Sequence, residues 1–101
     1  MDYIIVITSD PDKNSDFEQG LEIAMTLSDL ELKCSVSIEG DFLSKIENCS
    51  KDSVYLKKLK QLELFDIPLI SSRAIPFSYC TVKDVCDIRQ IYKCALTIIC
   101  F

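Results

Sequence analysis

The chain has 101 residues, the size of one domain, so residues 1–101 are expected to form a single folding unit. Its formal net charge of −5 argues against a nucleic-acid-binding domain, because such domains need a basic face to displace counterions from phosphates. Its hydrophobic share of 49% is high for a lone domain of this size, which predicts apolar surface that faces another subunit.

The start of the chain predicts a soluble, cytoplasmic protein. Met1-Asp2 has no basic flank, and the apolar run Tyr3–Ile7 is shorter than the core of a secretory signal or a membrane span. Thiols in a reducing compartment stay free, and no two cysteines have the two-residue spacing of zinc or dithiol redox motifs. The cysteines are Cys34, Cys49, Cys80, Cys86, Cys94 and Cys100.

The missing residue types exclude several kinds of site. The chain has no histidine, which removes histidine-based nucleophilic and acid–base catalysis and zinc hydrolysis. The chain has only two glycines, Gly20 and Gly40, so it contains neither the glycine-rich dinucleotide-binding motif nor a P-loop. We therefore predict no catalytic residue, no cofactor site and no metal site, with thiol chemistry as the only credible remainder.

The first half of the chain alternates strand and helix patterns. The β-branched run Tyr3–Ile7 is typical of a central strand covered on both faces. Ser15 and Glu18 have the spacing of a capping box, which predicts a helix over Asp16–Asp29. Gly20 inside that helix suggests a close approach of strand and helix.

The next segment has the period of a strand. Lys33–Ile38 alternates apolar and serine residues, which predicts an edge or half-covered strand. We expect residues 39–41 to form a turn, after which Phe42, Leu43 and Ile46 pack back onto the core. Cys34 is interpreted as a small buried hydrophobe of this strand rather than a reactive thiol.

A second helix and a third strand follow. Ser53 or Asp52 is positioned to cap a helix whose apolar stripe is Tyr55, Leu56, Leu59 and Leu62. Pro68 cannot continue that helix, so Pro68–Ser71 is predicted to be a strand, lying beside the first one.

The end of the chain repeats the alternation. Pro76–Cys80 is predicted to be a fourth short strand, residues 81–84 open a third helix, and Ala95–Phe101 forms the last strand. The apolar residues of this third helix recur at helical spacing and are Val82, Val85, Ile88 and Tyr92. The alternation predicts a three-layer α/β domain with about five mainly parallel strands.

Few positions could carry chemistry. Ser71 ends the third strand, where open α/β sheets bind ligands. Cys80 stands at the predicted junction of strand and helix, where a helix dipole favours thiolate, but we interpret it first as a small residue that fills the strand end. The Thr8-Ser9 loop could hold an anion or be an ordinary capped turn.

Charged clusters have plain explanations. Asp10, Asp12 and Asp16 lie where receiver domains place acidic residues, but Ser71 replaces the phospho-acceptor aspartate such domains need. Three lysines on the second helix are interpreted as a solvated face; they are Lys57, Lys58 and Lys60.

Several short motifs, in order and spread over the whole length, resemble one family. They are Gly20-Leu21-Glu22, Glu39-Gly40 followed by Phe42, Leu62-Glu63-Leu64-Phe65-Asp66-Ile67, and Ile98-Ile99-Cys100-Phe101. With the opening strand, they make the chain resemble the DsrE/DsrF-like superfamily, and within it the TusC (DsrF-type) subunits of TusBCD sulfur-relay complexes.

This resemblance implies a flavodoxin-like (DsrE-like) fold in a cytoplasmic hetero-oligomer that passes persulfide sulfur toward 2-thiolation of the tRNA wobble uridine. TusB-like and TusD-like subunits would be the partners, and the sulfur carrier protein would be reached through the TusD-like subunit. The family's carrier cysteine, which follows the third strand, aligns with Ser71, so the resemblance implies a non-carrier subunit. The alternative is a persulfide-carrying sulfurtransferase that uses Cys80.

Overall fold

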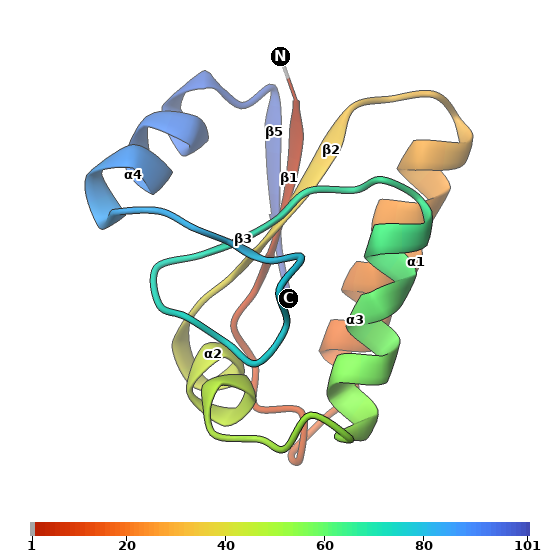
Figure 1. The fold of residues 1–101 in the computed structure, drawn as a ribbon. Helices are drawn as coiled ribbons and strands as arrows, with labels where there is room; N and C mark the ends of the chain where they lie inside the picture. The colour runs from red at the N-terminus through yellow and green to blue at the C-terminus, as the bar shows by residue number, and fades with distance from the viewer. Residues whose placement is uncertain (1) are drawn as a thin grey trace.

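A computed structural model describes residues 2–101 and shows one parallel sheet with helices around it (Figure 1). The strands are β1 (Tyr3–Ile7), β2 (Cys34–Ile38), β3 (Leu69–Ser71), β4 (Thr81–Val82) and β5 (Thr97–Cys100). The helices are α1 (Asp16–Asp29), α2 (Gly40–Glu47), α3 (Val54–Leu64) and α4 (Val85–Cys94). The strand order is β4-β3-β2-β1-β5, and every pairing is parallel.

The helices make the layers of the predicted three-layer α/β fold. Helices α1 and α3 lie side by side on one face of the sheet, and α4 lies on the other (Figure 1). Helix α2 lies near the carboxyl ends of the strands, where the Phe42 amide donates to the Thr8 carbonyl at 3.1 Å. The three-layer α/β class predicted from the alternation is confirmed, and so is the flavodoxin-like fold that the resemblance implied.

The core lies mainly between the sheet and α1, α2 and α3. It contains alternate side chains of β1 and β2 together with the apolar stripes of the three helices. Its largest fully buried members include Ile5, Ile7, Val36, Ile38, Phe42, Ile46, Leu56, Leu59 and Leu62. The expected packing of Phe42, Leu43 and Ile46 onto the core is confirmed.

Gly20 marks a close approach of α1 to the sheet, as predicted. A Cβ atom at this position would lie 3.2 Å from the Phe101 ring and 3.3 Å from Ile7. The absence of a side chain therefore lets the helix lie close to β1 and to the end of the last strand.

Two expectations about strand positions are wrong. Strand β3 pairs with β2 and β4, so it does not lie beside β1. Strand β2 is consequently an interior strand, and of its two serines Ser37 is fully buried. The alternation predicted an edge or half-covered strand because serine is usually exposed. Ser35 is indeed only partly buried, but Ser37 has a hydrogen-bond partner inside the protein, as described below.

The segment after β2 is a helix and not a simple turn. Gly40 has φ of +56°, a left-handed conformation that side chains disfavour, and α2 begins there. The glycine was interpreted as a turn signal, and it does turn the chain sharply, but a full helix follows at once.

Only one of the two predicted helix caps is present. The Ser53 hydroxyl accepts a hydrogen bond from the Tyr55 amide at 3.2 Å, which confirms the cap of α3. The capping box of α1 is wrong: the Ser15 side chain makes no capping bond, and Asn14 accepts from the Asp16 amide at 3.1 Å instead. The Glu18 carboxylate is engaged elsewhere, in an ion pair with Lys58.

The region between β3 and α4 differs most from expectation. Residues 76–80 form turns, and the short strand β4 begins only at Thr81. Helix α4 begins at Val85, so Val82 lies outside it and is 52% exposed. The apolar run Pro76–Cys80 has the composition of a strand, but Pro76 lacks the N–H that a ladder needs.

Among residues 2–101, no helix is both long and apolar enough to cross a membrane.

Candidate functional site

Ser71 stands at the carboxyl end of β3, the position that the sequence singled out. Its side chain is completely buried, and its hydroxyl donates to the Arg73 carbonyl at 2.5 Å. Its own carbonyl accepts from the Lys83 amide at 2.9 Å, which ties the strand end to the segment after β4. The hydroxyl proton is therefore already used to hold the loop that follows β3.

Cys80 lies directly beside Ser71. Its Sγ atom is 3.4 Å from the Ser71 Oγ atom, although Cys80 comes nine positions later in the chain. Because the serine proton is given to Arg73, the serine oxygen is free to accept from the thiol. The structure thus brings together the two residues considered for sulfur chemistry.

The surroundings of Cys80 favour the neutral thiol. The side chain is half-buried, and this burial raises its pKa above the ordinary value of 9.0. Arg73, the cation closest in sequence to Ser71, is directed to Glu47, with 3.4 Å between Nη2 and Oε1. A thiol held neutral at pH 7 is a poor nucleophile and a poor acceptor of sulfur.

The predicted activation of Cys80 by a helix dipole is wrong. Helix α4 starts five residues later, at Val85, so Cys80 does not stand at a helix N-terminus. The dipole effect falls off within the first turn of a helix and does not reach this thiol.

The Thr8-Ser9 loop, considered as an anion site, has its backbone donors engaged. The amides of Thr8 and Ser9 both donate to the Phe101 carbonyl, at 2.7 and 3.3 Å, and the Thr8 hydroxyl donates to the same oxygen at 3.1 Å. These bonds join the ends of β1 and β5, and the ordinary turn explains the loop.

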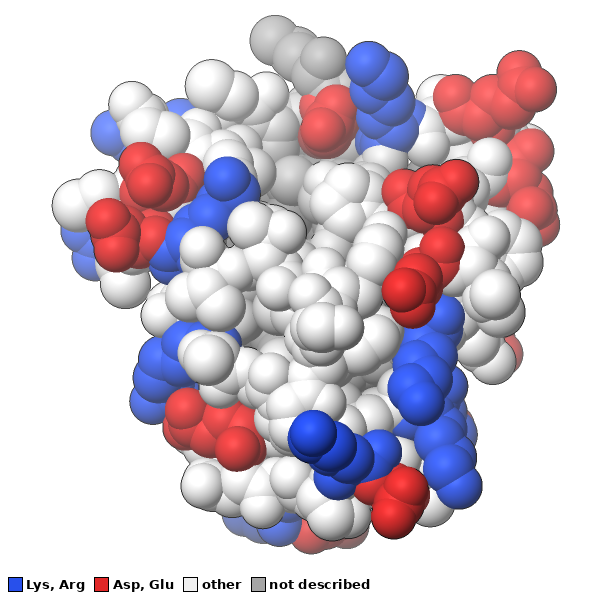
Figure 2. Space-filling view, in the orientation of Figure 1, with Lys and Arg blue, Asp and Glu red and all other residues white. Residues whose placement is uncertain are grey.

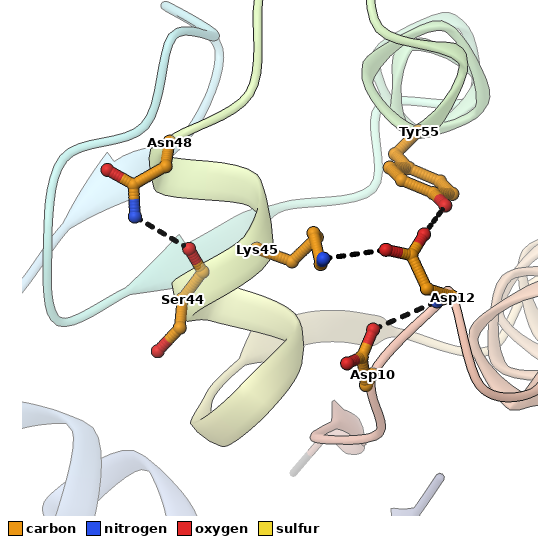
Figure 3. Close-up of polar contacts among 6 residues, drawn as sticks. All are labelled: Asp10, Asp12, Ser44, Lys45, Asn48 and Tyr55. Atoms are coloured by element: carbon orange, nitrogen blue, oxygen red, sulfur yellow. Dashed lines mark hydrogen bonds and ion pairs between the residues drawn. The ribbon is translucent and has the colours of Figure 1, made fainter.

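Asp12 links the loop after β1 to two helices (Figure 3). Its carboxylate pairs with Lys45 of α2 at 2.6 Å and accepts a short hydrogen bond from the Tyr55 hydroxyl of α3. The bond to Lys45 and then the bond to Tyr55 lower the pKa of Asp12 below its ordinary value of 3.8. Asp10 accepts from the Asp12 amide at 2.9 Å. The acidic loop therefore has a structural role.

A polar network on the α4 face was not predicted. The Tyr92 hydroxyl donates to Glu39 at 2.8 Å and lies 2.6 Å from the hydroxyl of buried Ser37. Because the phenol has one proton and gives it to Glu39, Ser37 is the donor in the second bond. Burial is the main cause that raises the pKa of Tyr92 far above its ordinary value. The helical spacing of Tyr92 from Ile88 was its only sequence signal.

All six cysteines are free thiols, as expected. Cys34 is buried and donates to the Ala24 carbonyl at 3.3 Å, and its burial raises its pKa, which fits the packing role predicted for it. Over residues 2–101, no three side chains of the metal-binding types gather closely enough to hold an ion.

No family model matches the chain, and no curated protein matches it in sequence. Among solved structures, it is similar to the YchN protein from E. coli, with a TM-score of 0.75 and 14% identity over 100% of both chains. The two proteins share their fold. The likeness covers the full length of both chains. At 14% identity it concerns the arrangement of helices and strands and says nothing of the residues of a site.

Proposed function

We propose that this protein is a TusC-like, non-carrier subunit of a cytoplasmic sulfur-relay complex that serves 2-thiolation of the tRNA wobble uridine. The single observation that carries the proposal is Ser71. At the end of β3, where the resemblance locates the family's sulfur carrier, the chain has an oxygen that is fully buried and already donates to Arg73. A hydroxyl cannot form a persulfide.

Three further observations support this role. The chain shares its fold with YchN over the whole of both chains, which agrees with the fold that the resemblance to the DsrE/DsrF-like superfamily implies. The Cys80 thiol next to Ser71 is half-buried with a raised pKa. The surface also carries exposed apolar side chains suited to contact other subunits, among them Leu30, Val54, Leu64, Val82, Val85 and Leu96.

The charge distribution fits a subunit that does not hold tRNA itself. Figure 2 shows uncharged side chains over the centre of one face, with acidic and basic side chains interspersed around it. A surface that follows a nucleic-acid backbone needs clustered positive charge, and the chain carries −5 overall. In the proposed complex, sulfur and tRNA are handled by the partners.

Reconstitution tests the proposed partners. The chain is mixed with TusB-like and TusD-like subunits from the same source, and the complex is followed by size-exclusion chromatography with light scattering. The proposal predicts one stable assembly that contains all three chains. A chain that elutes alone in the presence of both subunits contradicts it.

The second candidate is a sulfurtransferase that carries persulfide on Cys80, and the 3.4 Å contact between Sγ and the Ser71 oxygen is the observation that favours it. In such a step, the thiolate attacks the outer sulfur of a donor persulfide, and the donor leaves as a thiolate. After exposure to a persulfide donor, alkylation and mass spectrometry would locate the sulfur on Cys80. Cys49→Ser is the matched control for Cys80→Ser, because Cys49 is also half-buried.

A further inference from the structure

Helix α4 is anchored to the sheet by fewer buried side chains than the other helices of the described chain. It lies on the face of the sheet opposite α1 and α3 (Figure 1). Of its ten residues only Ile88 is buried. Helix α3, with eleven residues, buries three leucines, which are Leu56, Leu59 and Leu62. Because most of the stability of a helix in a protein comes from packing its apolar face, α4 is the helix whose docking is weakest.

The packing beneath the C-terminal part of α4 is open. A hollow of about 580 Å³ lies between this helix and β1, and its lining includes Ile4 of β1 and Ile91 and Cys94 of α4. Ile91 lies three positions after Ile88, on the same side of the helix, yet it is only partly buried. The close apolar contact of α4 with the sheet is therefore centred on Ile88 and does not extend along the helix.

Tyr92 provides a polar attachment beside this apolar one. Its hydroxyl is 2.8 Å from the Glu39 carboxylate and 2.6 Å from the hydroxyl of Ser37 in β2. Among residues 2–101, no other side-chain hydrogen bond joins α4 to the rest of the protein, and the ion pairs all lie outside α4. Two side chains, Ile88 and Tyr92, thus provide the main attachment of the helix.

Helix α4 is too short to persist once it leaves the sheet. Isolated helices of fewer than about 12 to 15 residues are marginal in water, and α4 has ten. Its first residue is preceded by Asp84, whose side chain makes no capping bond to the helix amides. When Ile88 and Tyr92 detach, the helix is therefore expected to unfold, and its backbone amides become accessible to solvent.

Detachment of α4 would uncover one face of the sheet and leave the main core intact. Ser37 faces α4, because its hydroxyl meets Tyr92. Val6 and Ile70 are the register partners of Ser37 on the two neighbouring strands, so their side chains point to the same face. Both are buried but do not belong to the main core cluster. The main core lies on the opposite face, which α1 and α3 cover.

We propose that α4 is a flap, which detaches from the sheet and unfolds as one unit while the remainder of the domain stays folded. Asp84 and Ala95 flank the helix in extended conformation and are the positions at which the flap hinges. The closed state is held by Ile88 and Tyr92. The open state gives access to the sheet face that contains Val6, Ser37 and Ile70. Such sub-global openings occur where few apolar contacts are buried. This flap does not depend on the sulfur-relay role.

Amide hydrogen exchange of the full chain, followed by mass spectrometry of its peptides, tests the proposal. Peptides from α4 are expected to exchange at least about tenfold faster, relative to an unfolded chain, than peptides from α3. The reason is that α3 amides are released only when the whole domain unfolds, whereas α4 amides are released whenever the flap opens.

Two matched substitutions separate the flap from global unfolding. Ile88→Val and Ile5→Val each remove one methylene group from a buried isoleucine, the first on α4 and the second in the main core. Ile88→Val should speed the exchange of α4 about two- to tenfold. Ile5→Val should speed the exchange of α3 by a similar factor and leave that of α4 unchanged, because the flap opens without disturbing the main core.

Three results would overturn the proposal. The first is an α4 that is as well protected from exchange as α3. The second is an α4 whose exchange rises in Ile5→Val by the same factor as that of α3, since the helix would then open only with the whole domain. The third is an α4 whose exchange does not respond to Ile88→Val, which would show that Ile88 does not hold the closed state.

Discussion

Tyr92 supplies the only side-chain partner of the buried Ser37 hydroxyl in the described chain and also donates to Glu39. We predict that Tyr92→Phe lowers the free energy of unfolding by about 1 to 3 kcal/mol, because it leaves Ser37 buried without a partner. Chemical denaturation measures the loss. The double variant Ser37→Ala/Tyr92→Phe should lose less than the sum of the two single losses, and strictly additive losses contradict the network.

The same residue predicts sensitivity to alkali. The folded-state pKa of Tyr92 is raised above the ordinary value of 10.0, mainly by burial. Its contribution to stability is therefore fully present below pH 10 and is lost as the pH rises toward the folded-state pKa. Denaturation midpoints measured on both sides of pH 10 should fall less steeply in Tyr92→Phe than in the wild-type chain. An identical fall in both would show that Tyr92 does not titrate as described.

Gly40 is required by its backbone conformation. Its φ of +56° is strained for any residue with a Cβ, so Gly40→Ala should destabilise the protein by about 1 kcal/mol. Ser44→Ala, an exposed position in the same helix, is the control and should have little effect. Thermal melting compares the two variants, and equal melting temperatures would contradict this explanation.

The contact between Ser71 and Cys80 shows where prediction from residues ends. The position of Ser71 at a strand end could be predicted, because Pro68 cannot continue the preceding helix and the apolar residues Leu69 and Ile70 lead directly to Ser71. Its neighbour could not be predicted, because residues 72–80 are irregular and no periodicity describes how such a segment turns back. The sequence therefore placed the Cys80 thiol at the start of a helix, whereas in the structure it lies beside Ser71, the last residue of β3.

At the scale of elements, the Asp12 contacts join α2 and α3 to the loop after β1 (Figure 3). The pKa of Asp12 is lowered in the folded state, so its contribution to stability is present above its ordinary value of 3.8 and is lost as the pH falls through the folded-state pKa. Asp12→Asn should therefore be less stable at pH 7 and show a weaker loss of stability below pH 4. Urea denaturation measures both, with Asp41→Asn as the control; an unchanged acid profile contradicts the role.

Helices and strands could be predicted wherever the pattern of apolar residues kept a helical or strand spacing over several residues. The runs Tyr3–Ile7 and Asp16–Asp29 have the bounds that their patterns predicted. Helix α2 was missed because Gly40 is a strong local turn signal, and β4 was misplaced because the apolar run before it has strand composition without a strand's hydrogen bonds. Strand order has no local signal. Ser37 made β2 resemble an edge or half-covered strand, whereas β2 pairs with β1 and β3 and the contact with Tyr92 provides the buried Ser37 hydroxyl with a partner.

As a whole, the protein is a small acidic domain that leaves several apolar side chains exposed. One face of α1 and α3 packs against the core, whereas Val82 of β4, Val85 of α4, Ile98 of β5 and Leu96 just before β5 are exposed. Figure 2 shows that uncharged side chains also form a continuous area on the face drawn. Such surfaces favour contacts between proteins, in agreement with the proposed subunit role.

In the proposed function, this chain assists sulfur transfer without carrying sulfur itself. The most direct measurement is mass spectrometry of each chain in the reconstituted complex after it receives persulfide from a donor. The TusD-like chain is expected to gain the mass of sulfur, and this chain is expected to keep its mass. An added sulfur atom on this chain, located on Cys80, would contradict the account and establish the alternative.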